Sequence, residues 1–346
     1  MTIIENYDLG ANNTFRMKVK CARFLEYDSA AELEGLQWDT LPLPVKHIGE
    51  GSNLLFTGDF PGTVLHSRIK FVKYVDMGFD DIPVMVGAGL RWDDFVSETC
   101  GHGLWGAENL SLIPGEVGAA AVQNIGAYGV EIKDILQGVV CYDLKERKKV
   151  KFSAAECAYA YRDSLFKQAQ DRYIVTSVLF RLSRKYKPRL EYRGVREALG
   201  IEAGALPEDL TPQKVREAII RIRKEKLPDP EEIGSAGSFF KNPVVDALAF
   251  AGVIDAARRE EGADVVIPHF INPDGTVKIP AAWLIDRCGL KGAAQGGAAV
   301  YEKQPLVIVN ADGEATADDI LSLEKRIIST VRDRFGIELH PEVEHV

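Results

Sequence analysis

Short runs rich in β-branched and aromatic residues dominate the first half of the chain, which is the pattern of β-strands. Five such runs are VKHI, IPVMVGAG, DILQGVVCYDL, KKVKFS and RYIVTSVLFRLS. Helical patterns are sparser here. One helix is predicted to begin near Trp92, with Asp93 and Asp94 in its first turn and Gly101 after its end. These patterns predict an α+β fold.

Helical periodicity is stronger in the second half. Thr211 is a predicted N-cap, with Pro212 at the first helical position. Apolar residues then recur at helical spacing, with Arg and Lys on the opposite face; they are Val215, Ala218, Ile219 and Ile222. The sequence KLPDP, residues 226–230, is expected to end this helix because proline cannot continue it.

Three further helices and one strand are predicted before the C-terminus. The helices run to about Glu261, around AAWLIDRC before Gly289, and from near Thr316 to Gly336; the strand is PLVIVN. Asp319 follows Thr316 by three residues, as in a capping box. The tail ELHPEVEHV is predicted to be extended.

The length of 346 residues suggests two or three domains, and we place boundaries near residues 70 and 208. Residues 184–210 are predicted to form a lid loop, to about residue 200, followed by a linker. Apolar content of 46% and charged content of 27% are ordinary for a soluble protein. A net charge of −9 disfavours a general nucleic-acid binder.

No apolar run approaches the roughly 18 residues of a membrane span, so no membrane insertion is expected. The first residues carry no secretory signal pattern, and a cytoplasmic location is expected. The five cysteines are scattered and form no CxxC, and no HExxH occurs, so neither a disulfide framework nor a metal site is predicted.

Two glycine clusters could hold a ligand. The first is HIGEGSNLLF, in which Gly49, Gly51, Ser52 and Asn53 follow a predicted strand. Glycines can expose successive backbone N–H groups to an anion, and Ser and Asn can add hydrogen bonds. The cluster is neither GxGxxG nor GxxxxGK[ST], so Rossmann and P-loop sites are poor matches. Taken alone, it is more simply a tight turn between strands.

The second cluster covers residues 102–131, a stretch dense in glycine and nearly free of charge. Four consecutive small residues at 118–121 would let the backbone lie against a large planar ligand. Neutral hydrogen-bonding groups are available from Asn109, Gln123, Asn124 and Tyr128, as a heterocycle requires. A loop of this length is hard to justify without a ligand, so a binding site is predicted here.

Seven motifs in order resemble one known family. They are GEGSNLLF, ENLSLIPGEVGAAAVQNIGAYG, YRDSLFK, KLPDP, GSAGSFFKNP, AAWLIDRCGLKG and the final PEV. Together they resemble the UDP-N-acetylenolpyruvoylglucosamine reductases (UDP-N-acetylmuramate dehydrogenases, the MurB family) from about residue 10 onward. YRDS and the tyrosine-containing stretch after Leu182 resemble the longer, type I form.

This resemblance implies three domains: residues 1–70 and 71–208 as the two parts of an FAD-binding module of the vanillyl-alcohol oxidase (PCMH) type, and residues 209–346 as a UDP-sugar domain. It implies that NADPH reduces FAD and that flavin N5 passes a hydride to the terminal carbon of the enolpyruvyl ether. The product would be UDP-N-acetylmuramate, a peptidoglycan precursor. The partners expected are small molecules, and a monomer is expected.

Three residues match the catalytic set of the family. Arg162 would stabilise the enolate, Glu342 would share the carboxylate site, and Ser238 would protonate the α-carbon. Each has a simpler explanation by itself. Ser238 could be a turn hydroxyl, Arg162 could pair with Asp163 at the surface, and Glu342 could be a solvated tail residue.

The resemblance also implies binding residues. The cofactor-binding residues are Gly49, Gly51, Ser52, Asn53, Asn109, Pro114, Gly115, Gly118, Asn124, Ile125, Gly126 and Ala127. The substrate-binding residues are Tyr128, Tyr192, Lys226, Lys241, Asn242 and Gln304. One position departs from the pattern: near Phe270 some relatives carry a tyrosine that touches the nucleotide, and here that hydroxyl is missing.

Two other functions remain open at this point. An FAD oxidase of the same superfamily, acting on another alcohol or sugar, would need neither a serine acid nor a UDP site. A non-catalytic flavin-binding module would need no catalytic residues at all. Reduction of the flavin by NADPH would exclude the first, and NADPH oxidation triggered by the enolpyruvyl sugar would exclude the second.

Overall fold

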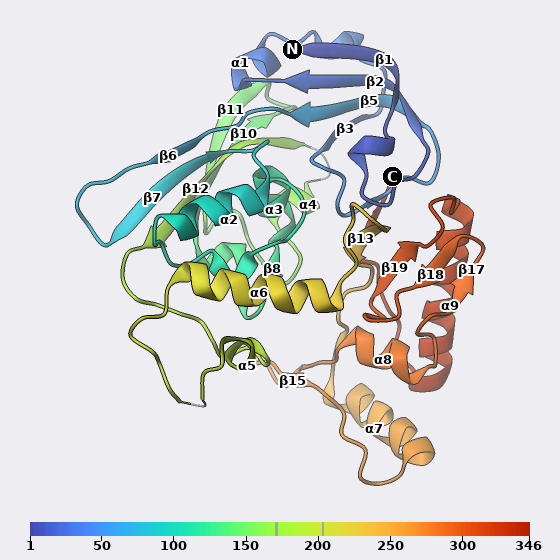
Figure 1. Ribbon diagram of the computed structural model, residues 1–346. Coiled ribbons are helices and arrows are strands. Elements are labelled where there is room, and N and C mark those ends of the chain that lie inside the picture. The colour runs from blue at the N-terminus through green and yellow to red at the C-terminus, as the bar shows by residue number, and fades with distance from the viewer. Residues whose placement is uncertain (170–171, 203) are drawn as a thin grey trace. The chain divides into compact units, whose positions relative to one another are not determined.

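The computed structural model describes residues 1–169, 172–202 and 204–346, so residue 203 of the predicted linker lies outside it. The chain forms two compact units, each assembled from three stretches (Figure 1). Unit 1 consists of Met1–Asp8, Lys20–Glu50 and Phe60–Glu225. Unit 2 consists of Leu9–Val19, Gly51–Asp59 and Lys226–Val346. A further division of the first 208 residues into two FAD-binding parts stays a prediction.

Unit 1 contains two principal sheets. In the first, of order β1-β2-β5-β3, β1 is antiparallel and the other strands are parallel to one another. Its strands are β1 (Thr2–Asp8), β2 (Lys20–Tyr27), β3 (Val45–Ile48) and β5 (Phe60–Ser67). The second, of order β11-β10-β12-β7-β6, is antiparallel. Its strands are β6 (Val72–Tyr74), β7 (Asp81–Gly87), β10 (Leu136–Asp143), β11 (Lys148–Ser153) and β12 (Tyr173–Ser183).

The remaining elements of unit 1 are helices and one short hairpin. The α-helices are α1 (Ala30–Glu34), α2 (Trp92–Gly101), α3 (Val117–Gln123), α4 (Leu165–Gln168), α5 (Val195–Leu199) and α6 (Pro212–Lys226), the last residue of which belongs to unit 2. The 3-10 turns are Trp38–Thr40, Glu108–Leu110 and Ile132–Asp134, and β8 (Gly126–Ala127) pairs with β9 (Val130–Glu131).

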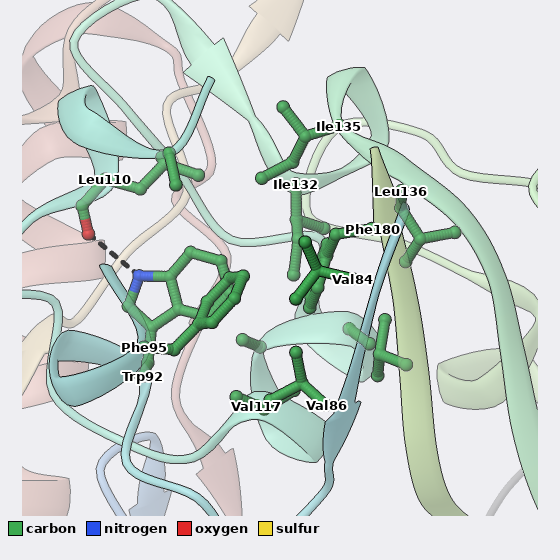
Figure 2. Packing of buried hydrophobic residues seen from close by; sticks show 14 of the residues in the cluster. Val84, Val86, Trp92, Phe95, Leu110, Val117, Ile132, Ile135, Leu136 and Phe180 are labelled. Atoms are coloured by element: carbon green, nitrogen blue, oxygen red, sulfur yellow. Dashed lines mark hydrogen bonds between the residues drawn. The ribbon is translucent and has the colours of Figure 1, made fainter. Parts of the chain in front are cut away.

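The main core of unit 1 lies where α2 and α3 pack on the five-stranded sheet. Figure 2 shows Trp92 and Phe95 of α2 beside Phe180 of β12. Trp92 is fully buried and its indole Nε1 donates to the carbonyl of Leu110 at 2.8 Å. Because a buried indole needs a hydrogen-bond acceptor, this bond fixes the start of the 102–131 segment against the core.

Unit 2 is built on short strands and three helices. One sheet has the order β13-β19-β18-β17 and a second the order β14-β16-β15, while β20 pairs with β4. The strands are β4 (Leu54–Leu55), β13 (Gly234–Ser238), β14 (Val244–Val245), β15 (Phe270–Ile271), β16 (Val277–Lys278), β17 (Ala294–Gln295), β18 (Ala298–Val300), β19 (Val307–Asn310) and β20 (Glu344–His345). The helices are α7 (Ala247–Glu261), α8 (Ala281–Arg287) and α9 (Ala317–Phe335), with a 3-10 turn at Gly10–Asn12.

The structure contains the predicted elements together with others that were not predicted. The strands β1, β2 and β5 were not predicted; β1 is exposed at all but one position, so it shows no alternating pattern. Residues 102–131 are not one long loop, because the small residues at 118–121 lie within helix α3. Arg216 is buried rather than on an outer face of α6. Among the residues described, no helix is long and apolar enough to cross a membrane.

Arg216 of α6 forms a bidentate ion pair with Asp93 in the first turn of α2. Its Nη1 lies 2.5 Å from Oδ1 of Asp93, and its Nη2 lies 2.8 Å from Oδ2. Its side chain is 9% exposed and that of Asp93 is 26% exposed. Burial acts most strongly and raises the pKa of Asp93, but the hydrogen bonds from Arg216 and the Leu112 N–H, with the nearby arginine charges, together outweigh it, and the pKa falls below 3.8. The pair should therefore stabilise the fold above pH 3.8 and lose this contribution as the pH falls further.

We expect Arg216→Met to lower the free energy of unfolding by about 3 kcal/mol at pH 7, because it leaves a partly buried carboxylate without its cation. Denaturant unfolding measures this, and the deficit should shrink below about pH 4, where Asp93 becomes protonated. The control is Arg184→Met, which removes the exposed pair with Asp76 and should cost less than about 1 kcal/mol. Equal losses of unfolding free energy in the two variants would contradict a larger contribution from the Arg216–Asp93 pair.

Candidate active site

The first glycine cluster is divided between the two units. Gly49 and Glu50 follow β3 in unit 1, whereas Gly51, Ser52 and Asn53 belong to unit 2. In unit 1, a Cβ on Gly49 would lie 3.2 Å from Oε2 of Glu116 and 3.3 Å from the Cβ of Ala119. Glu50 accepts a hydrogen bond from the backbone N–H of Gly115 at 3.0 Å. The two glycine-rich segments of unit 1 therefore meet at this turn.

The second glycine cluster is held in place by two buried asparagines. Asn109 donates from Nδ2 to the carbonyls of Tyr128 and Arg189, at 2.8 and 2.9 Å, while its Oδ1 is buried without a hydrogen-bond partner. Asn124 has φ +45° and donates to the carbonyl of Ala160 at 2.8 Å. Both side chains are fully buried, so they shape the segment, while residues 125–128 remain half-buried and accessible.

Arg162 occupies a strained tight turn beside this segment. Ala160 and Asp163 form two backbone hydrogen bonds with each other, and Arg162 between them has φ +53°. A left-handed conformation costs an ordinary L-residue about 1–2 kcal/mol, and such strain is concentrated at functional sites. The guanidinium donates from Nη2 to the carbonyl of Gly126 at 2.8 Å. A Cβ on Gly126 would lie 3.1 Å from Nη1, so glycine leaves room for the guanidinium.

Tyr128 and Tyr192 come together in unit 1. Their rings meet edge to face with centroids 5.4 Å apart, although 64 residues separate them in sequence. Arg223 of α6 hydrogen-bonds the Tyr128 side chain and donates from Nε to the carbonyl of Leu112 at 3.2 Å. Burial lowers the pKa of Arg223, and the contact with Tyr128 opposes this. The sequence analysis did not single out Arg223, because it is one of several arginines and lysines of α6 and belongs to no motif.

Ser238 ends β13 in unit 2, next to an irregularity in the strand. The pairing of β13 with β19 shifts between Ser235 and Ser238, and Gly237 has φ +70° with open space where a Cβ would be. A bulge of this kind redirects the side chain that follows it. Ser238 is half-buried, whereas Phe239 and Phe240 are fully buried. The two phenylalanines anchor the strand and leave the serine near the surface of unit 2.

The C-terminal tail runs beside the residues that follow Ser238. The N–H of Glu342 donates to the carbonyl of Phe239 at 2.8 Å, and the N–H of Lys241 donates to the carbonyl of His340 at 2.9 Å. Asn53 donates from Nδ2 to the carbonyl of Glu342 at 3.1 Å and accepts from the N–H of Glu344. Unit 2 thus brings Ser238, Asn53 and the backbone of Glu342 together from three distant parts of the chain.

The other predicted substrate-binding residues of unit 2 are Lys226, Lys241, Asn242 and Gln304. Oδ1 of Asn242 accepts from the N–H of Ala281 at 2.9 Å, at the start of α8. Lys241 and Gln304 are half-buried and Lys226 is exposed. Phe270 is 56% exposed and lies under Nζ of Lys278, which is 5.5 Å from the ring centroid.

In unit 1, the lid predicted at about residues 184–200 contains α5 and Tyr192.

Comparison with known proteins identifies the family. The chain is 47% identical over 344 residues to the UDP-N-acetylenolpyruvoylglucosamine reductase of Bacteroides fragilis (strain YCH46), covering 99% of both chains. It is 44% identical over 345 residues to that of Burkholderia cenocepacia (strain HI2424), covering 99% of this chain and 96% of the relative. The chain belongs to the UDP-N-acetylenolpyruvoylglucosamine reductase family.

Two family models match separate parts of the chain. The C-terminal domain of UDP-N-acetylenolpyruvoylglucosamine reductase matches residues 229–346, and an FAD binding domain matches residues 39–146. The crystal structure of the reductase from Thermus caldophilus aligns with a TM-score of 0.67 at 24% identity, covering 99% of this chain and 98% of that one. This likeness shows the fold and confirms the predicted α+β class.

The residues of unit 1 fit an FAD molecule. Half-buried backbone at 125–128 would offer peptide groups to a flat ring, and Oδ1 of Asn109, which is buried without a hydrogen-bond partner, would accept from a ring N–H. Gly49 and Gly115 lie where the two glycine-rich segments of unit 1 meet, and the backbone N–H groups of these segments would bind the diphosphate. Glu50 and Glu116 at this turn are both engaged by hydrogen-bond donors.

Proposed function

We propose that this chain uses NADPH to reduce the enolpyruvyl ether of UDP-N-acetyl-3-O-(1-carboxyvinyl)glucosamine, giving UDP-N-acetylmuramate for peptidoglycan synthesis. Identity of 47% to a reductase of this name over 99% of both chains carries the proposal. The match of an FAD binding domain to residues 39–146 supports the flavin cofactor. When bound, FAD supplies the two-electron relay between NADPH and the double bond.

The overall reaction balances with one hydride and one proton. NADPH gives up the hydride, which ends on the terminal carbon of the enolpyruvyl group, and the α-carbon takes a proton from the protein. The carbon–carbon double bond becomes a single bond, and NADP⁺ and the lactyl ether are the products. Negative charge develops on the α-carbon and its carboxylate, so the protein must supply a cation and an acid there.

Unit 1 supplies the cation in this proposal. The guanidinium of Arg162 is a permanently charged, forked donor that suits a carboxylate. Its Nη2 already donates to Gly126, which limits the orientations that the side chain can take. The strained backbone at φ +53° also favours a specific placement of Arg162 rather than a solvated surface role. Tyr128 and Tyr192 would cover the sugar nucleotide from the same unit.

Unit 2 supplies the acid. The hydroxyl of Ser238 would deliver the proton to the α-carbon, and solvent would restore it. A serine is a very weak acid, so its alkoxide must be stabilised by cationic neighbours or by a proton relay. Glu342, whose backbone hydrogen-bonds to Phe239, would share the site of the substrate carboxylate. Lys226, Lys241, Asn242 and Gln304 would bind the UDP-sugar, with lysine Nζ as a point charge for the diphosphate.

The deciding experiment is an anaerobic flavin assay. The purified full-length chain, supplied with FAD, should show flavin absorption that NADPH bleaches. Addition of the enolpyruvyl UDP-sugar should restore the absorption and yield UDP-N-acetylmuramate with one NADPH consumed per product. A flavin that NADPH cannot reduce would favour an oxidase of the superfamily. A reduced flavin that the sugar does not reoxidise would contradict the proposal.

A further inference from the structure

His66 lies between two carboxylates from different parts of unit 1. Its Nδ1 is 3.0 Å from Oε1 of Glu26, and its Nε2 is 2.9 Å from Oε1 of Glu116. His66 is on β5 and Glu26 on the neighbouring β2, whereas Glu116 immediately precedes α3. The side chains are 13%, 21% and 5% exposed in the order His66, Glu26, Glu116. We call these three residues the histidine clamp.

The clamp touches the turn that suits a diphosphate. Oε2 of Glu116 lies 3.2 Å from the position that a Cβ on Gly49 would take, and the neighbouring Gly115 donates its N–H to Glu50. Glu116 also forms an isolated bridge with Arg91, and its carbonyl accepts from the N–H of Ala120. The clamp therefore connects the four-stranded sheet to the short stretch at which the two glycine-rich segments meet.

Both ring nitrogens of His66 face acceptors, so the ring makes both hydrogen bonds only while the clamp holds a proton. Burial alone would lower the pKa of His66, but the hydrogen bond and charge of Glu116, and then those of Glu26, outweigh it and raise the pKa above 6.5. Burial also raises the pKa of Glu116, which His66 opposes. Both directions favour retention of the proton at neutral pH.

Other charged groups surround the clamp. Arg68 donates to Oε2 of Glu26 at 3.3 Å, Glu50 acts to raise the pKa of Glu116, and Lys70 acts to lower it. Arg91 pairs with Glu50 at 3.0 Å. Other titratable neighbours are His47, whose pKa the charge of His66 acts to lower, and Tyr7 and Tyr27. Burial lowers the pKa of His47 to about 3, so His47 stays neutral between pH 6 and 9. His66 and Glu116 are thus the groups whose shared proton can be lost in this range.

We propose that His66 is a positioning residue for FAD: its protonated ring neutralises Glu116 and fixes the Gly115–Glu116 turn, so that loss of the clamp proton weakens retention of FAD. The proposal rests on FAD as the cofactor. When the proton leaves, Glu116 and Glu26 together carry two negative charges around a neutral ring. Glu116 then lies as a buried anion beside the turn assigned to the diphosphate, where like charge is unfavourable.

The sign of the pH effect follows from the raised pKa of His66. FAD binds the protonated clamp more tightly, so its affinity is greatest below the pKa of His66, which is raised above 6.5 in the folded protein, and falls as the pH rises through that pKa. FAD should therefore be held tightly at pH 6 and more weakly at pH 9. A purely structural role for the clamp would change the affinity without this dependence on pH.

The test measures FAD release by holoprotein in a dilution series between pH 6 and 9, using the rise in fluorescence of free flavin. For the unaltered chain, the dissociation constant should increase roughly tenfold across this range, the effect of about one unit of pKa difference. His66→Gln keeps a hydrogen-bond donor but not the charge, so its constant should be raised roughly tenfold at pH 6 and be flat with pH. Circular dichroism confirms folding.

Two further variants separate the explanations. Glu116→Gln removes the buried charge, so FAD should be retained within about threefold of the unaltered chain at pH 6, with a flattened pH dependence. His269→Gln, a change of an exposed histidine in unit 2, should follow the unaltered chain at every pH. A flat profile for the unaltered chain, or a sloping one for His66→Gln, would overturn the role of the clamp. A chain that retains no FAD at pH 6 would instead remove the cofactor assignment.

Discussion

Replacing Ser238 by alanine should leave NADPH reduction of bound flavin intact and slow turnover by roughly 100- to 10,000-fold, the usual contribution of one positioned acid. The hydroxyl should be needed only when the α-carbon is protonated, after the flavin has been reduced. Stopped-flow spectroscopy separates the two half-reactions: bleaching by NADPH should keep its rate, and reoxidation by the enolpyruvyl sugar should be slow.

The matched control for this change is Ser235→Ala, in the same strand. Ser235 is 2% exposed, so its hydroxyl faces the interior of unit 2 and is not available to a substrate. This variant should reoxidise at close to the normal rate if the strand remains intact. Normal reoxidation by Ser238→Ala would remove Ser238 from the mechanism, whereas equal loss in both variants would indicate damage to β13.

Replacing Arg162 by lysine should lower kcat roughly 100- to 1,000-fold, similar to the loss of one preorganised donor to a developing oxyanion. Lysine keeps the positive charge but cannot form the forked pair with a carboxylate or hold the contact with Gly126 in the same geometry. The steady-state rate of NADPH oxidation with saturating sugar measures the effect, and the affinity for FAD should change little.

Arg147→Lys is a close control for this substitution. Arg147 is also an arginine of unit 1 in a left-handed conformation, with φ +51°, and it pairs with the exposed Asp39. The same change of side chain on the same kind of backbone should leave kcat within about twofold, because an exposed ion pair contributes little. Near-normal kinetics of Arg162→Lys would contradict the proposed stabilisation of the enolate.

The sequence predicted elements best where local chemistry defines both ends. Helix α9 has the expected capping box of Thr316 and Asp319 at its start and Gly336 with φ +68° after its end. Helix α6 begins at Pro212 and ends at Lys226 as expected, with its apolar stripe buried. These boundaries depend on hydrogen bonds between residues a few positions apart, so they can be recognised without knowledge of the fold.

Features that depend on distant partners could not be predicted. The strand β1 is mostly exposed and gains its hydrogen bonds from β2, so its own sequence carries little periodicity. Helix α3 lies in a glycine-rich stretch that resembles a loop, and burial of its small residues against the core makes it helical. The placements of buried Arg216 and half-buried Arg223 depend on Asp93 and Tyr128, which are more than 90 residues earlier.

In the candidate site, too, some features can be recognised from the sequence and others only from the structure. The types of residue were recognised from motifs, and their roles in chemistry stay a proposal. Their local geometry came only from the structure: the strained turn at Arg162, the bulge before Ser238 and the pairing of Glu342 with Phe239. His66 carries no motif, because its importance depends on the two carboxylates that strand pairing and α3 bring to it.

The interleaved chain path of unit 2 has a practical consequence for anyone wishing to isolate it. A peptide starting at Lys226 would lack Leu54–Leu55, against which β20 pairs, and would also lack Thr14, whose hydroxyl donates to the carbonyl of Ser235 at 2.5 Å. The carbonyl of Val346 accepts from both the backbone N–H and the hydroxyl of Thr57. A fragment intended to fold as unit 2 must therefore retain Leu9–Val19 and Gly51–Asp59 together with the later residues.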